Sequence, residues 1–237
     1  MQKYRRFMLK LSGESLSRGG KGQGIDQPTL HLLAKHIAEV VKAEKVEMVI
    51  VVGGGNIWRF RDTKESGIER TSSDAMGMLA TILNSVSLQA ALESYGVHTR
   101  VLSAIHVPQL AEPYIKRRAV RHLEKGRIVI CAGGTGNPFF TTDSAAALRA
   151  LELNCEVVLK ATNVDGVYDK DPRKYRSAKK YEQLSYDEAI QKHLNVMDQA
   201  AFSLCREQKL PIFVFNFTQP KNLHKAVRGE RVGTMVR

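Results

Sequence analysis

Residues 133–150 read GGTGNPFFTTDSAAALRA, so a glycine turn and two phenylalanines stand directly before a run of hydroxyl residues and a helical pattern. The preceding residues, 127–132, are mostly apolar and predict a buried strand. A strand, a glycine-rich turn and a helix in this order form the repeating unit of an α/β fold. The stretch therefore predicts an α/β protein, and it places aromatic and hydroxyl side chains together in one loop.

The same alternation extends in both directions from this stretch. Further strands are predicted at residues 6–11, 47–52, 97–102, 156–160 and 212–216, with an edge strand near 234–236. Helices are predicted at residues 26–45, 74–95, 115–124, 144–151, 185–193, 198–208 and 219–228. This rhythm predicts a mainly parallel sheet with helices on both faces, and no linker or internal repeat divides residues 1–237. We expect a single domain.

Composition narrows the class of protein. The chain is 43% hydrophobic and 25% charged, which is ordinary for a soluble enzyme, and its uninterrupted apolar runs are too short to cross a bilayer. The N-terminus does not read as a signal peptide, so we expect a cytoplasmic protein without a membrane partner. Cys131, Cys155 and Cys205 lie far apart beside apolar neighbours, which indicates buried, reduced thiols.

The formal net charge of +12 suggests an anionic partner. Basic residues cluster at 3–6, 116–121 and 170–180, although solvated surface is the commoner explanation of any single cluster. The clusters lack the interleaved aromatic residues of a single-strand nucleic-acid binder. An anionic substrate explains the charge at least as well as RNA does.

Small residues follow four of the predicted strands. They are Ser12-Gly13, Gly53-Gly54-Gly55-Asn56, Gly133-Gly134-Thr135-Gly136 and Ala161-Thr162-Asn163. Ligands of open α/β sheets bind at the carboxyl ends of the strands, and small residues let backbone N–H groups approach phosphate. Four such ends predict a phosphate-rich ligand. Neither the GxxxxGK[ST] motif nor a GxGxxG after a strand is present, so the site is not one of the two common nucleotide-binding designs.

Charged residues near these turns are candidates for chemistry. Lys10 lies just before Ser12-Gly13 and Lys160 ends the predicted strand 156–160, where both could neutralise phosphate oxygens. Arg59 could form a forked contact with phosphate. Asp74 and Asp143 stand at predicted helix starts, so each could simply cap its helix. Asp143 could instead hold the lysines in place, or an aspartate could act as a general base.

Seven segments together resemble a known family: KLSGE (10–14), GIDQPTL (24–30), VVGGGNIWR (51–59), DAMGMLATILN (74–84), GGTGNPFFTTDSAA (133–146), VVLKATNVDGVYDKDP (157–172) and VMDQAAFSL (196–204). In this order and spacing they are similar to bacterial uridylate kinases, a branch of the amino-acid-kinase fold family. TGNPFFTTD is specific to that branch. The resemblance implies a three-layer αβα sandwich of the carbamate-kinase-like type. It places the UMP side in the N-terminal two-thirds and the ATP side mainly in residues 155–237.

The resemblance also implies transfer of the ATP γ-phosphoryl group to UMP, with Mg²⁺ accompanying ATP and no protein metal ligand assigned. UMP-binding positions are Gly54, Asp74, Thr135, Gly136, Asn137, Pro138, Phe139, Phe140, Thr141 and Thr142. ATP-binding positions are Lys10, Leu11, Ser12, Gly13, Gly55, Arg59, Thr162, Asn163, Tyr168 and Asp171. The catalytic set is Lys10, Asp143, Lys160, Arg59 and Asp198, with Asp198 positioning the metal or the lysines.

The family further implies a homohexamer and GTP or UTP as effectors. Residues 18–26, RGGKGQGID, resemble the segment linked to GTP activation, but Gln23 stands where an aromatic residue is usual. Two alternatives stay open at this stage. One is a kinase of the same fold with a carboxylate or carbamate acceptor, and the other is a basic nucleic-acid-binding regulator.

Overall fold

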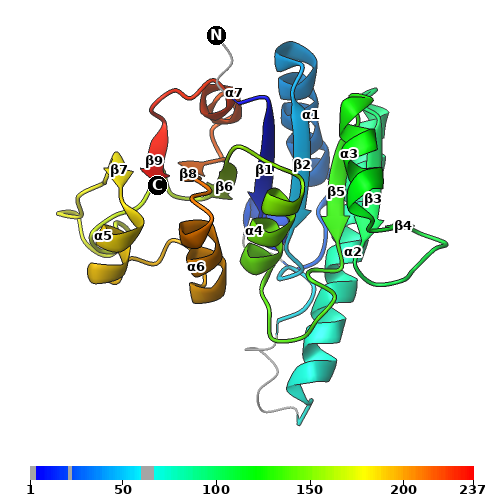
Figure 1. Cartoon of the computed structure of the whole chain (residues 1–237), viewed down its shortest axis with the longest axis horizontal. Helices are drawn as coiled ribbons and strands as arrows, with labels where there is room; N and C mark the ends of the chain where they lie inside the picture. Colours follow the sequence, from blue (N-terminus) through cyan, green and yellow to red (C-terminus); the bar gives the residue numbers. More distant parts are fainter. Residues whose placement is uncertain (1–3, 21–22, 60–66) are drawn as a thin grey trace.

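The computed structural model describes residues 4–20, 23–59 and 67–237, and these form an α/β fold around one nine-stranded sheet (Figure 1). The strands are β1 (Arg6–Leu11), β2 (Glu47–Val52), β3 (Thr99–Ser103), β4 (Glu112–Pro113), β5 (Ile128–Ala132), β6 (Val158–Thr162), β7 (Gln183–Leu184), β8 (Ile212–Asn216) and β9 (Gly233–Val236). Their order is β4-β3-β5-β2-β1-β6-β8-β9-β7, and of the pairings between these strands only β8 with β9 is antiparallel. The predicted parallel sheet is confirmed.

Helices cover both faces of the sheet. They are α1 (Gln27–Glu44), α2 (Arg70–Ser94), α3 (Lys116–Glu124), α4 (Thr142–Glu152), α5 (Tyr186–Gln191), α6 (Gln199–Glu207) and α7 (Asn222–Val227), with short 3-10 turns η1 (Gly13–Leu16) and η2 (Arg18–Gly20). Residues of α1, α2 and α7 share one hydrophobic cluster, whereas α3, α4, α5 and α6 contribute to the other. Along β1, Phe7 and Leu9 face the first cluster and Met8 faces the second, as the two-residue period of a strand requires.

Several element boundaries differ from the sequence-based predictions, and those of two helices change the interpretation of an aspartate. Helix α2 begins at Arg70, so Asp74 lies inside it and the capping interpretation of Asp74 is wrong. The early start is supported by tertiary structure, because the indole of Trp58 donates to the Ser73 hydroxyl at 2.8 Å. Helix α4 begins at Thr142 and is capped by Thr141, so Asp143 is not a cap either.

Strand β6 runs from Val158 to Thr162, so Lys160 lies at its centre rather than its end. Its pairing with β8 continues through Thr162 opposite Asn216, which sequence pattern alone does not reveal. Strand β9 is not at the edge of the sheet, because β7 pairs outside it. Strands β4 and β7 are two residues each and give no detectable periodicity.

Helix α2 is the one helix in the described residues that is long and apolar enough to cross a membrane, with a mean hydropathy of 1.4 over its most apolar window. It packs instead against α1 and the sheet through residues such as Ile82, Leu88 and Leu92. These three side chains belong to the main core cluster, so one face of α2 packs in the core.

Neighbouring leucines of α1 provide a test of this packing. Leu33 is 4% exposed within the core, whereas Leu32 is 55% exposed on the outer face of the same helix. We expect Leu33→Ala to lower the free energy of unfolding by about 2–5 kcal/mol, because it leaves a cavity. Leu32→Ala should change it by less than about 1 kcal/mol. Urea unfolding of both variants measures the difference, and equal losses would contradict the assigned face of α1.

Candidate active site

The four turns of small residues lie side by side, because they follow the adjacent strands β5, β2, β1 and β6. This edge is the lower end of the sheet in Figure 1. The parallel register pairs Lys10 of β1 directly with Lys160 of β6. Neighbouring paired residues point to the same face of a sheet, so the two ammonium groups are brought together by the register itself.

Asp143 lies between these two lysines. Its Oδ1 is 2.6 Å from Lys10 Nζ and its Oδ2 is 2.7 Å from Lys160 Nζ. All three side chains are less than 16% exposed. Lys160 Nζ also donates to the carbonyl oxygen of Val196 at 2.6 Å. The predicted association of Asp143 with both lysines is therefore present in the structure.

Electrostatics favour the charged form of Asp143. Burial would raise the pKa of Asp143, but the adjacent ammonium groups of Lys10 and Lys160 outweigh it and hold the pKa below its usual range. Burial lowers the pKa of Lys160, and the charge of Asp143 opposes that effect. Asp143 thus allows two like charges to occupy a desolvated position at the end of the sheet.

Asp198 caps α6 and ties it to the start of α4. Its carboxylate accepts from the backbone N–H of Ala201 at 3.0 Å and from the hydroxyls of Thr141 and Ser144. Asp198 makes no hydrogen bond to either lysine, although Val196, two residues earlier, binds Lys160. The geometry therefore gives Asp198 an anchoring role at the N-terminus of the helix that carries Asp143.

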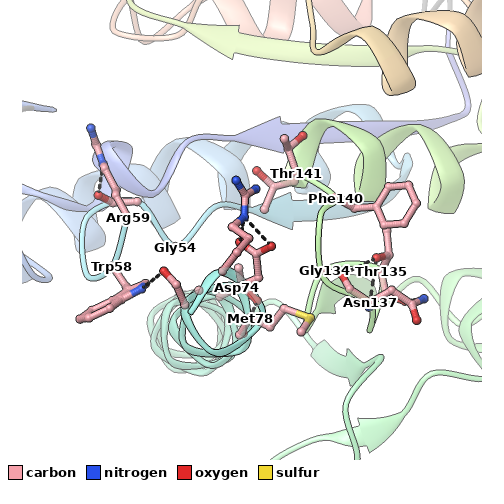
Figure 2. A pocket seen from close by; sticks show the side chains of 16 residues that line it. Gly54, Trp58, Arg59, Asp74, Met78, Gly134, Thr135, Asn137, Phe140 and Thr141 are labelled. Atoms are coloured by element: carbon pink, nitrogen blue, oxygen red, sulfur yellow. Dashed lines mark hydrogen bonds and ion pairs between the residues drawn. The ribbon is translucent and has the colours of Figure 1, made fainter. Parts of the chain in front are cut away.

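A cavity of about 320 Å³ opens between the glycine turns, α2 and the 134–142 loop (Figure 2). Its lining residues are Gly54, Gly55, Trp58, Arg59, Arg70, Ser73, Asp74, Gly77, Met78, Thr81, Gly134, Thr135, Asn137, Phe140, Thr141 and Thr142. Seven of the predicted UMP positions are among them. Gly136, Pro138 and Phe139 belong to the same loop but do not line the cavity, and Phe139 is 66% exposed.

Asp74 holds the loop against α2. Its carboxylate accepts from Arg70 Nε at 2.8 Å and from the backbone N–H of Phe139 at 2.8 Å. Phe139 adopts a φ of 69°, a left-handed conformation that is unusual for a bulky residue. The Asp74 contact stabilises that turn, and Figure 2 shows Asp74 at the centre of the cavity, with Trp58 and Arg59 to one side and Phe140 to the other.

Arg59 faces protein groups on the opposite wall. Its guanidinium donates to the Gly55 carbonyl and pairs with Glu14, which follows the Ser12-Gly13 turn. Gly54 is fixed by packing, because a Cβ there would lie 2.8 Å from the Gly77 carbonyl oxygen and 2.9 Å from the Ala80 Cβ. A side chain at Gly54 would therefore push the turn away from α2.

A second cavity, of about 420 Å³, lies beyond Lys160. Its lining residues are Lys160, Thr162, Val164, Gly166, Val167, Tyr168, Asp169, Lys170, Asp171, Pro172, Arg173, Lys192, His193, Leu194, Asn195, Val196 and Val214. Of the predicted ATP positions, Thr162, Tyr168 and Asp171 line it. Gly55 and Arg59 line the first cavity instead, and Leu11 is fully buried, so only its backbone can reach a ligand. Lys10, Ser12, Gly13 and the exposed Asn163 line neither cavity.

The ionised cluster connects the two cavities. Thr142 lines the first, Asp143 follows it in α4, and Lys160, bound to Asp143, lines the second. Lys160 therefore faces the second cavity, and Asp143 adjoins a residue of the first cavity's wall. This arrangement suits transfer of a phosphoryl group between two bound molecules.

No cluster of three or more metal-ligating side chains occurs among residues 4–20, 23–59 and 67–237. Asp143 and Asp198 are already engaged with lysines, hydroxyls and a backbone N–H. Mg²⁺ characteristically binds through substrate phosphates and water with few protein carboxylates. The site therefore fits a metal ion that is carried by a nucleotide's phosphates.

Sequence reasoning missed several residues of the site. Glu14 forms a contact with Arg59 across 45 residues, and Trp58 lines the first cavity. Arg70 and Met78 were also missed. Met78 lies one turn after Asp74, so helical spacing could have placed it on the same face, whereas Arg70 precedes the predicted start of the helix. The three cysteines are buried and unpaired by disulfides, as predicted. Arg61 lies outside the described residues.

Comparison with known proteins places the chain in a family. The model of the amino acid kinase family matches residues 5–216. A uridylate kinase of Cereibacter sphaeroides is 54% identical over 233 residues, covering 98% of this chain and 94% of that protein. The chloroplastic uridylate kinase PUMPKIN of Arabidopsis thaliana is 53% identical, over 99% of this chain and 69% of that protein.

A solved structure agrees with this assignment. The crystal structure of UMP kinase from Bacillus anthracis has a TM-score of 0.95 and 42% identity, covering 99% of this chain and 96% of that one. The fold expected from the sequence is thus found in a solved relative. The chain belongs to the amino acid kinase family, and within it to the uridylate kinases.

Proposed function

We propose that the chain transfers the γ-phosphoryl group of ATP to UMP, giving UDP and ADP. The observation that carries this proposal is the Lys10–Asp143–Lys160 cluster between two cavities at the glycine-rich edge of the sheet. The high identity to uridylate kinases over nearly the whole chain supports UMP as the acceptor. In this arrangement the first cavity takes UMP and the second takes ATP.

The chemistry follows from the charges at the site. A phosphate monoester is already ionised near neutral pH, so its attacking oxygen needs no general base. Catalysis of phosphoryl transfer depends on alignment and on cations placed against the developing charge. Lys10 and Lys160 supply fixed positive charge, the glycine turns supply N–H groups, and Asp143 keeps both lysines in place. When bound with ATP, Mg²⁺ would neutralise phosphate charge.

The remaining residues divide between the two substrates. The 134–142 loop encloses the base and ribose, with Asp74 holding the loop in its turn. Arg59 is placed to exchange Glu14 for a phosphate oxygen. Thr162, Tyr168 and Asp171 form the ATP side, where the Tyr168 hydroxyl donates to Asp165 and the Arg173 N–H donates to Asp171. Asp198 supports Asp143 by anchoring α4 to α6.

Assembly as a homohexamer is part of the proposal, supported by the outer face of α2. Met76, Leu79 and Leu83 occur at one-turn spacing there and are all exposed, with Leu79 and Leu83 each more than half exposed. A second copy of the chain would cover such an apolar stripe. GTP and UTP as effectors and a cytoplasmic location remain parts of the same proposal, resting on the family resemblance.

Two other functions are less well supported. A carboxylate or carbamate kinase of the same fold is not favoured, because the relatives that match nearly the whole chain are uridylate kinases. A nucleic-acid-binding role rests only on the net charge of +12. It predicts an RNA affinity that falls steeply with salt and persists when Lys10 is replaced.

Acceptor specificity tests the proposed function. In a coupled assay of ADP release with UMP, CMP, dTMP and AMP, we expect UMP to give the highest kcat/KM. Cytosine exchanges an acceptor for a donor on the base edge, which leaves a buried polar group unpaired at a cost of about 1–3 kcal/mol. UMP should therefore exceed CMP by about 5- to 150-fold. Equal values for UMP and CMP would refute the assigned base pocket. ADP release with glutamate or aspartate, and none with UMP, would refute the proposed function.

Replacing Asp143 separates catalysis from capping. Thr141, not Asp143, caps α4, so Asp143→Asn should leave the helix intact. The variant loses the charge that holds Lys10 and Lys160, and we expect kcat to fall by about 10²–10³-fold. The affinity for UMP should change little, because the 134–142 loop is untouched. Steady-state kinetics and UMP titration measure both quantities, and a near-normal kcat would show that Asp143 does not organise the lysines.

The pKa of Asp143 predicts a pH dependence of stability. Because its folded-state pKa lies below the unfolded value, its charge stabilises the fold above the unfolded pKa of about 3.9. That contribution is lost as pH falls from there through the folded-state pKa. The stability difference between the native chain and Asp143→Asn should therefore be constant from pH 5 to 7 and shrink below pH 4. Urea unfolding across this range checks it, and a constant difference down to pH 2 would contradict the lowered pKa.

A further inference from the structure

Two asparagines form a buried amide pair beneath the phosphate-facing turns. Asn56 ends the GGGN turn after β2, and Asn84 lies on the inner face of α2; they are 3% and 0% exposed. Asn84 Nδ2 donates to Asn56 Oδ1 at 2.7 Å, and Asn56 Nδ2 donates to Asn84 Oδ1 at 3.2 Å. The two side chains therefore satisfy each other in a site closed to solvent.

Each amide also holds a backbone segment. Asn84 Nδ2 donates to the Gly53 carbonyl at 2.7 Å, which fixes the start of the turn. Asn56 Nδ2 donates to the Gly24 carbonyl at 2.8 Å, and the Gly24 N–H donates back to the Asn56 carbonyl at 2.7 Å. The pair thus connects α2, the turn after β2 and the chain before α1.

The turn after β1 rests on the same pair. A Cβ at Gly13 would lie 2.4 Å from Asn56 Oδ1, 2.7 Å from the Gly53 carbonyl oxygen and 2.8 Å from the Gly55 nitrogen. The backbone of the first turn is therefore packed directly on the Asn56 amide and on the second turn. A shift of Asn56 would move both turns.

We propose that the Asn56–Asn84 pair is a positioning device for phosphoryl transfer, which sets the turns at Gly13 and Gly53–Gly55 against the reacting phosphates. This inference rests on the proposed function. Neither side chain lines either cavity, so each acts through the backbone that it holds. Catalysis by alignment is sensitive to such support, because a displacement of about 1 Å can cost about 10²-fold in rate.

An amide pair suits this role better than apolar packing does. The Gly53 carbonyl oxygen needs a donor at a place without water, and Asn84 provides one while a second hydrogen bonds Asn56. Hydrogen bonds are directional, so they fix both the distance and the orientation of the turn relative to α2. Apolar contacts fix the distance but not the orientation. Loss of the pair should therefore affect alignment more than binding of the UMP base.

The test uses Asn84→Leu, which keeps the branched shape and the number of heavy atoms of the asparagine side chain but removes both donors and the acceptor. The matched control is Ser85→Ala, because Ser85 is equally buried and its hydroxyl bonds only the Thr81 carbonyl within α2. We expect Asn84→Leu to lower kcat by about 10- to 100-fold with less than about threefold change in the KM for UMP. Ser85→Ala should leave kcat within about twofold. Circular dichroism and thermal melting confirm that both variants are folded at the assay temperature.

Asn84→Asp adds a second measurement, the pH dependence of activity, which would not change if the pair had a purely structural role. A carboxylate there faces two acceptor oxygens in a buried site, so its pKa should be raised. When protonated, it can donate an O–H to the Gly53 carbonyl and restore one bond of the native amide. The ratio of Asn84→Asp activity to native activity should therefore rise as pH falls from 8 to 6. The same ratio for Asn84→Leu should stay flat.

The outcomes separate the two levels of the proposal. If the native chain releases no ADP with UMP, the proposed function fails, whatever the variants do. If the native chain is active and folded Asn84→Leu retains kcat within twofold, the positioning role is overturned. A KM effect without a kcat effect, or a flat pH ratio for Asn84→Asp, would equally overturn it.

Discussion

The site depends on one electrostatic constraint, which is that two lysines side by side in adjacent strands need a shared anion. The register of β1 with β6 places Lys10 beside Lys160, and burial at the sheet edge removes the water that would screen them. Asp143 resolves the repulsion with one oxygen for each ammonium group. For that, α4 must begin at a fixed point, and Thr141 and Asp198 provide the contacts that define it. The position of the Asp143 carboxylate thus depends on the sheet register, on the cap of α4 and on the docking of α6.

Helix α2 organises the other side of the site. Asp74 holds the backbone of Phe139, the Thr81 hydroxyl accepts from the Gly133 N–H, and Asn84 donates to the Gly53 carbonyl. Two of the four turns of small residues are therefore fixed by one helix. Its opposite side carries the exposed apolar stripe of Met76, Leu79 and Leu83. A subunit contact that moved α2 would therefore move both turns together. In this way the proposed subunit interface would be coupled to the proposed UMP site.

The sequence predicted what is local or repetitive. The bounds of β1, β2 and β8 follow from apolar runs and agree with the structure to the residue, and the capped helix α1 is one residue shorter at each end than its predicted span. The boundaries of α2 and β6 were wrong because a distant partner extends each element, Trp58 in one case and β8 in the other. Arg59 and Glu14 are 45 positions apart in the sequence, and Asn56 and Asn84 are 28 positions apart. No periodic pattern in the sequence predicts such pairs. The sequence predicted that the turns of small residues meet at one edge of the sheet. It did not predict which distant residues hold these turns in place.

The ion pairs of the site also explain why the proposed reaction needs few side chains. Three cations of the site have an anionic partner: Lys10 and Lys160 share Asp143, and Arg59 pairs with Glu14. An arriving phosphate carries more charge than a carboxylate and can engage both lysines without displacing Asp143, because each ammonium has three donors. Burial lowers the pKa of Lys160, and Asp143 counteracts that loss of positive charge. Protein groups therefore hold these cations in place, so that the reorganisation needed during transfer is small.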